Sequence, residues 1–112
     1  MTFGKLSVHF ATIEAVEALR ADPAFSVSEI AGGPSLFGEL ATALELPDYF
    51  GHNWDALEEC LRDLENDRAI VLLVHNAQMR WRRASEEMTT LVDVWMAAAE
   101  ERGGNLHLVF VW

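Results

Sequence analysis

Three acidic residues that lie close together, Asp55, Glu58 and Glu59, are the first candidates for chemistry in this sequence. Asp55 and Glu59 are four positions apart, so on a helix they share one flank at a small cost in charge repulsion. Paired carboxylates can perform acid–base catalysis or bind a cation. His52 is near, but no nucleophile stands at a matching spacing, and we expect no enzyme. The pattern by itself favours a solvated helix face, with a cation-binding surface as the alternative.

The histidines and the single cysteine do not suggest a metal site. The sequence contains His9, His52, His75 and His107. None of them stands at a ligand spacing from another histidine or from Cys60, so we expect neither a metal nor a cofactor. Cys60 lies on an apolar helix stripe, which favours a buried small side chain over a reactive thiol. A lone cysteine cannot form an internal disulfide.

Negative charge is concentrated in one segment of the chain. The 112 residues carry a net charge of −10, and residues 45–67 supply −7 of it because eight acids face only Arg62. The acids are Glu45, Asp48, Asp55, Glu58, Glu59, Asp63, Glu65 and Asp67. Such a surface argues against direct binding of nucleic acid, whose phosphates are also negative. It allows a basic partner, a cationic substrate or simply high solubility, and the composition does not choose among these.

A short basic cluster stands apart from this acidic segment. Arg80, Trp81, Arg82 and Arg83 are consecutive. Arginine beside tryptophan can stack on or bind nucleic acid, but four residues in an acidic protein are a weak signal for it. A solvated helix entry or an internal ion-pair surface is the favoured interpretation.

The length and hydropathy predict one soluble domain. No apolar run reaches the roughly 18 residues that a membrane span needs. Residues 1–5 lack the basic flank and apolar block of a signal peptide. Together with the cysteine content, this predicts a cytoplasmic protein without membrane contact. We expect a monomer when the protein is free, because an acidic binding surface must remain accessible.

Strand-like and helix-like patterns alternate along the chain. The predicted strands cover residues 6–10, 25–30, 70–74 and 106–112, and the predicted helices cover residues 13–19, 35–44, 54–64 and 85–99. Pro34 or Ser35 begins the second helix. Strands separated by helices imply parallel pairing through right-handed crossovers. The prediction is an α/β fold with a small parallel sheet of three strands, or four if residues 1–22 add one, flanked by helices.

The local signals around the acidic residues predict a loop followed by a capped helix. Pro47 ends the preceding helix, because it removes a donor and disfavours helix at Leu46. Gly51 marks a backbone turn, and Asn53 can cap the next helix. The apolar stripe of that helix is Leu57, Cys60, Leu61 and Leu64.

The segment from Leu46 to Leu61, LPDYFGHNWDALEECL, resembles the signature of the barstar family. That signature has Leu-Pro, an acid, two aromatic residues, Gly, Asn two positions later, then Asp-Ala-Leu and an ending of acid, Cys and Leu. The resemblance covers roughly residues 25–112, and residues 1–22 are an N-terminal extension of a single barstar-like domain. It implies a parallel sheet with flanking helices and 1:1 inhibition of a basic ribonuclease, whose active-site cleft is blocked by an acidic helix and the loop before it.

The resemblance also implies which residues bind the partner. Asp55 and Glu59 would be the central carboxylates that face the basic residues of the enzyme. Tyr49 would pack near the enzyme's catalytic histidine, and we expect at least one of Tyr49 and Trp54 to be exposed. The implied partner-binding residues are Tyr49, Gly51, Asn53, Trp54, Asp55, Glu58 and Glu59.

Four positions depart from the family pattern. Glu59 replaces the usual Asp, and Glu58 and Leu64 each replace a Trp. The family pattern also has an acid on the last helix, and in this chain that place falls at about Ala98, with Glu100 nearby. These departures motivate an alternative, a non-inhibitory barstar-like module that binds another basic protein.

Overall fold

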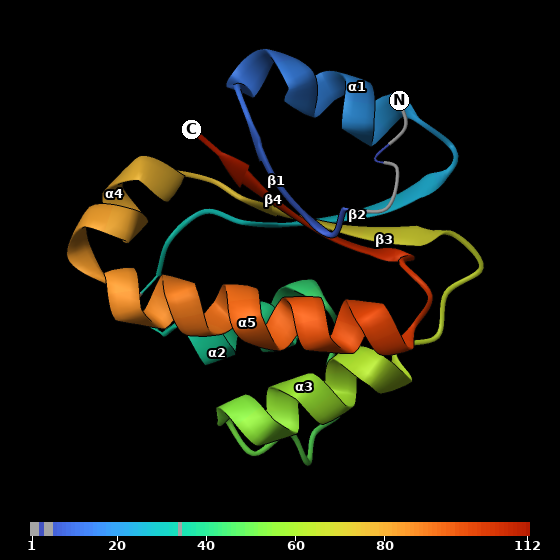
Figure 1. Ribbon diagram of the computed structural model, residues 1–112, viewed down its shortest axis with the longest axis vertical. Coiled ribbons are helices and arrows are strands. Elements are labelled where there is room, and N and C mark those ends of the chain that lie inside the picture. The colour runs from blue at the N-terminus through green and yellow to red at the C-terminus, as the bar shows by residue number, and fades with distance from the viewer. Residues whose placement is uncertain (1–2, 4–5, 34) are drawn as a thin grey trace.

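A four-stranded parallel sheet is the centre of the fold (Figure 1). The computed structural model describes residues 3, 6–33 and 35–112. The strands lie in the order β1-β4-β3-β2, and the predicted α/β fold and parallel pairing are confirmed. The strands are β1 (Val8–Ala11), β2 (Phe25–Ile30), β3 (Ala69–Val74) and β4 (Leu106–Val111). The N-terminal extension does supply the fourth strand, at the edge beside β4.

One face of the sheet is covered by a short helical segment near the N-terminus. This segment consists of a 3-10 turn (Ile13–Ala15) followed by α1 (Val16–Ala21). Val16 and Leu19 of α1 are buried against Val71 and Val109 of the central strands. The extension therefore gives β3 and β4 an apolar cover on a face that would otherwise meet water.

The opposite face carries the larger core and, beyond it, an outer helix. α2 (Leu36–Ala43) and α5 (Ser85–Glu101) lie under the sheet in Figure 1, and α3 (Trp54–Asp63) lies below α5. Leu57 and Leu61 of α3 are fully buried in the same core as Leu91 and Trp95 of α5. The remaining helix, α4 (Ala77–Arg83), leads from β3 into α5. Because α3 touches the core with one side only, its other side is free for contacts with a partner.

The boundaries of α2 have clear local causes. The hydroxyl of Ser35 accepts a hydrogen bond from the Gly38 N–H and caps the start of the helix, while Pro34 lies outside the described residues. α2 ends at Ala43, one residue before the predicted end at Leu44 and four residues before Pro47. It ends there because Glu45 adopts a left-handed conformation, with φ at 51°, that allows the two hydrogen bonds of a Schellman motif to form.

The basic cluster of the sequence forms the helix α4, which the sequence suggested only as a helix entry. The guanidinium of Arg80 binds both carboxylate oxygens of Glu39 on α2, with N···O distances of 2.8 Å. Trp81 packs edge-on against Phe110 of β4. Ala84, with φ at −143° and ψ at 53°, separates α4 from α5.

Among the described residues, no helix is long and apolar enough to cross a membrane.

Candidate functional site

Asn53 sets the start of the acidic helix α3. Its side-chain oxygen accepts a hydrogen bond from the Ala56 N–H at 2.8 Å, as the sequence predicted. Its amide nitrogen donates to the Gly51 carbonyl at 3.2 Å, which ties the loop to the helix. Asp55 lies in the first turn, where the positive end of the helix dipole stabilises a carboxylate.

Aromatic packing holds the loop before α3 in place. Phe50 is buried, and its ring and that of Trp54 both pack against Phe37 of α2. The His52 ring packs beside Phe50. Tyr49 points to solvent with 84% of its surface exposed, so the prediction that Tyr49 or Trp54 is exposed is confirmed through Tyr49.

The turn expected at Gly51 is one residue further along. His52 has the left-handed backbone, with φ at 49°, and Gly51 does not. Gly51 is needed for a different reason, because a Cβ at this position would lie 3.1 Å from the amide nitrogen of Asn53. A larger residue there would push against the bond between Asn53 and the loop.

A groove of about 500 Å³ separates this loop from α3, and we call it the acidic groove. It brings together Tyr49, Gly51 and Glu59, three of the partner-binding residues inferred from the sequence. Three further acids line it that were counted in the sequence but not assigned a role: Glu45, Asp63 and Glu65. Their only signal in the sequence was the excess of negative charge in residues 45–67.

Glu45 occupies its place in the acidic groove at an energetic cost. A left-handed backbone costs a residue with a side chain roughly 1 kcal/mol or more, and glycine would avoid this cost. Retained strain of this kind is frequent at binding sites, where the side chain is needed.

Cys60 also lines the acidic groove, and it is partly buried against the core where the sequence favoured a buried small side chain. Its side chain is only partly covered because Cys60 lies at the edge of the stripe formed by Leu57 and Leu61. Burial raises the pKa of the Cys60 thiol, and the nearby carboxylates of Asp63 and Glu59 raise it further. The thiol therefore stays protonated and is a poor nucleophile.

The other predicted site residues lie around α3 without lining the groove. Asp55 is exposed, and Trp54 is half-buried against α2. The Glu58 carboxylate lies 3.9 Å from the guanidinium of Arg62, which also binds Glu101 of α5 at 3.2 Å. Among the described residues, no group of three or more His, Cys, Asp or Glu side chains is arranged to hold a metal ion.

The comparison with protein families agrees with this geometry. The family model described as Barstar (barnase inhibitor) matches residues 24–111. The chain belongs to the barstar family. No curated protein matched the chain in a separate search. The match begins after α1, so β1 and α1 lie outside the barstar region and add a strand and a helix to it.

The barstar resemblance had aligned an acid of the last helix with about Ala98. Ala98 is fully buried in the core and cannot contact a partner. Glu100 is exposed, but Glu101 is the acid of α5 that reaches α3, through Arg62. The bridge from Glu101 to Arg62 and Glu58 connects the two helices at the surface.

A residue that the sequence did not single out, Arg102, holds the end of α3. One nitrogen of its guanidinium donates to the carbonyls of Leu61, Arg62 and Leu64, at 3.2, 3.0 and 2.6 Å. These are carbonyls that a helix end leaves without partners, and the positive charge matches the negative end of the helix dipole. Asn53 and Arg102 thus fix the two ends of the acidic helix.

Proposed function

We propose that this barstar-family protein inhibits a basic ribonuclease by forming a 1:1 complex through α3 and the loop before it. The observation that carries the proposal is the acidic groove, which is lined by Glu45, Glu59, Asp63 and Glu65 and, among the residues that the structure describes, by no basic side chain. An arginine, lysine or protonated histidine of the enzyme would supply the missing charge.

The groove and its rim have different roles in this proposal. Glu59 binds a cationic side chain inside the groove, and the exposed ring of Tyr49 packs beside it. Asp55 meets a second basic group at the rim, above the start of α3. Glu58 and Trp54 contribute at the edge, and Gly51 and Asn53 keep the loop in a shape that needs little reordering on binding.

Charge also sets the rate of association in this proposal. The −7 charge of residues 45–67 attracts a basic enzyme over a distance of about 8 Å at physiological salt. We therefore expect the association rate to fall steeply as salt is added, while the dissociation rate changes little.

Titration of ribonuclease activity tests the proposal directly. The protein is titrated against a panel of basic microbial ribonucleases, and we expect stoichiometric loss of RNA cleavage for a cognate enzyme. Replacing Asp55 by Asn or Glu59 by Gln should raise Kd by at least about thirtyfold, because each leaves a buried basic group of the enzyme unpaired. The matched controls are Glu86→Gln and Glu87→Gln, exposed acids at the start of α5.

Two results would contradict the proposal. One is the absence of submicromolar binding to every enzyme of the panel. The other is an equal loss of affinity in the control variants, which would mean that only the net charge matters. Binding of a basic protein without protection of RNA would instead support the alternative, a non-inhibitory barstar-like module.

A further inference from the structure

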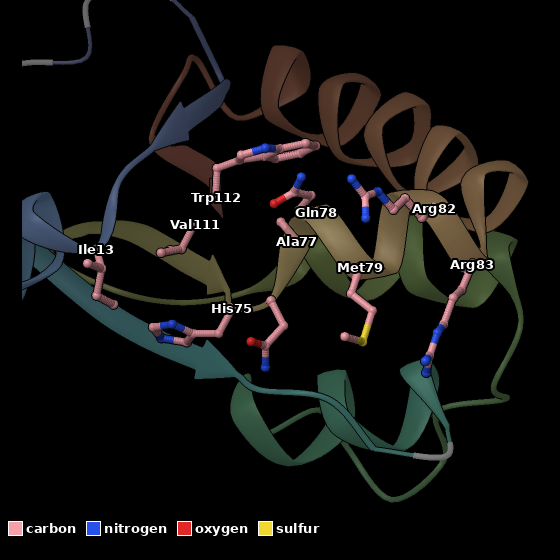
Figure 2. A pocket seen from close by; sticks show the side chains of 10 residues that line it. Ile13, His75, Ala77, Gln78, Met79, Arg82, Arg83, Val111 and Trp112 are labelled. Atoms are coloured by element: carbon pink, nitrogen blue, oxygen red, sulfur yellow. The ribbon is translucent and has the colours of Figure 1, made fainter.

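A second groove lies at the carboxyl ends of three strands, beside α4 and away from α3 (Figures 1 and 2). It has a volume of about 450 Å³ and is lined by the residues that follow β1 and β3, by the end of β4 and by α4. We call it the basic groove, because its lining, as far as the described residues go, includes Arg82 and Arg83 and no acidic side chain. The carboxyl ends of parallel strands are the usual place for ligands in open α/β sheets.

The basic groove contains polar side chains that the fold leaves unused. Within the described part of the chain, Gln78, Arg82 and Arg83 have no hydrogen-bond or ion-pair partner from another side chain. Arg80, their neighbour on α4, is by contrast held by Glu39. The two free guanidinium groups offer the planar donor pattern that recognises phosphate.

The polar groups on the opposite side of the groove are already engaged. His75 Nε2 lies 2.6 Å from a carboxylate oxygen of Glu29. The Asn76 side chain donates to the carbonyl of Ala31 at 2.9 Å. The free donors of the groove are therefore concentrated on the α4 side, where an anion would lie.

Apolar and aromatic side chains complete the groove. Trp112 is 53% exposed, although its backbone N–H donates to the Ala11 carbonyl and its ring meets that of Phe10 in an edge-on contact, so its position is defined while about half of its surface remains accessible. Figure 2 shows the Trp112 ring above Gln78, with Arg82 on the same side of α4. Met79 and Ile13 are also exposed large side chains on its walls. An indole ring with the Arg82 cation nearby is suited to a ligand that has both a flat ring and a phosphate.

We propose that the basic groove binds a small nucleoside phosphate, with the base stacked on Trp112 and the phosphate held by Arg82, which lies on the Trp112 side of α4 (Figure 2). The size agrees, since small-ligand sites measure roughly 300–1,000 Å³. The net charge of −10 disfavours a long RNA, which would meet the acidic surfaces, whereas a small ligand senses mainly the charges within about 8 Å. Ile13 belongs to the N-terminal extension outside the barstar match, so the extension helps to form this site.

Calorimetric titration of the full chain tests this proposal. The probes are 5′-AMP, adenosine, inorganic phosphate and a 5′-phosphorylated tetraadenylate. We expect saturable binding of 5′-AMP, weaker binding of adenosine and of phosphate, and no gain for the tetranucleotide. Arg82→Gln should weaken 5′-AMP binding about tenfold, and Trp112→Leu by a similar factor, because a charge-assisted hydrogen bond or a stacked base is lost.

Arg68→Gln is the matched control, because Arg68 is an exposed arginine that precedes β3 and lies outside the groove lining. It should leave the affinity for 5′-AMP unchanged. The proposal fails if 5′-AMP does not bind saturably, if Arg68→Gln weakens binding as much as Arg82→Gln, or if phosphate alone binds as tightly as 5′-AMP. Affinity that grows with oligonucleotide length would assign the groove to RNA and also overturn the proposal. None of these outcomes depends on inhibition of a ribonuclease.

Discussion

Replacing Asn53 by alanine tests how the start of the acidic helix is held. The substitution removes the cap of the Ala56 N–H and the bond from the Asn53 amide to the Gly51 carbonyl. The loss of an N-cap costs about 1 kcal/mol of unfolding free energy. Unfolding entropy of about 2.1 cal/mol/K per residue amounts to roughly 0.24 kcal/mol/K for the 112 residues, so we expect Tm to fall by about 4 °C.

Ser35→Ala is a matched control for this change. Ser35 caps α2 through the same kind of bond, to the Gly38 N–H at 3.2 Å, and lies outside the lining of the acidic groove. Both variants should lose about 1 kcal/mol in urea denaturation followed by circular dichroism. Only Asn53→Ala should also weaken ribonuclease binding, by about fivefold, because only its loop must be reordered on association.

Two outcomes would refute this reasoning. An unchanged stability of Asn53→Ala would mean that the cap does not form in solution. An equal loss of binding in both variants would mean that global stability, and not the shape of the loop, controls the affinity.

Three further substitutions have expected outcomes. Glu45→Gly should raise the unfolding free energy by about 1 kcal/mol, because glycine tolerates the left-handed backbone, and should weaken ribonuclease binding. Lowering the pH below 6.5 should destabilise the protein, because burial lowers the pKa of His9 and His107 in the folded state and the unfolded chain then takes up protons more readily. The variant His107→Gln should show a smaller loss of stability with falling pH in urea titrations. Glu29→Gln should lower the unfolding free energy by about 1 kcal/mol near neutral pH, because the bond to Arg20 lowers the pKa of Glu29 from 4.5 to about 2 while water partly screens the pair. The difference in stability from the unmodified protein should disappear as the pH falls from 4.5 towards 2.

Each of these predictions has an outcome that contradicts it. A Glu45→Gly variant that is less stable would show that its backbone is not strained. A His107→Gln variant with the same pH dependence would place the responsible groups elsewhere. A cost of Glu29→Gln that persists at pH 2 would mean that packing, and not the ion pair, is lost.

The sequence predicted features that depend on neighbouring residues. The Asn53 cap and the buried positions of Leu57 and Leu61 follow from the spacing of a few residues, and the structure confirms them. The parallel sheet followed from the alternation of strands and helices, because a parallel connection needs a crossover. Features that depend on competing local signals were less accurate, as the turn at His52 instead of Gly51 shows.

Local pattern and charge in the sequence determined the fold class, the acidic helix and the loop beside it. Only the tertiary structure decided which acids share a groove, because Glu45, in the turn after α2, comes close to Glu59 and Glu65 only when the loop before α3 lies against that helix. It also decided that Arg80 is bound by Glu39, while Arg82, on the Trp112 side of α4, has no side-chain partner among the described residues. Contacts between residues that are remote in the sequence depend on the distances between their segments. Those distances are set by how the buried faces of the helices and the sheet pack together.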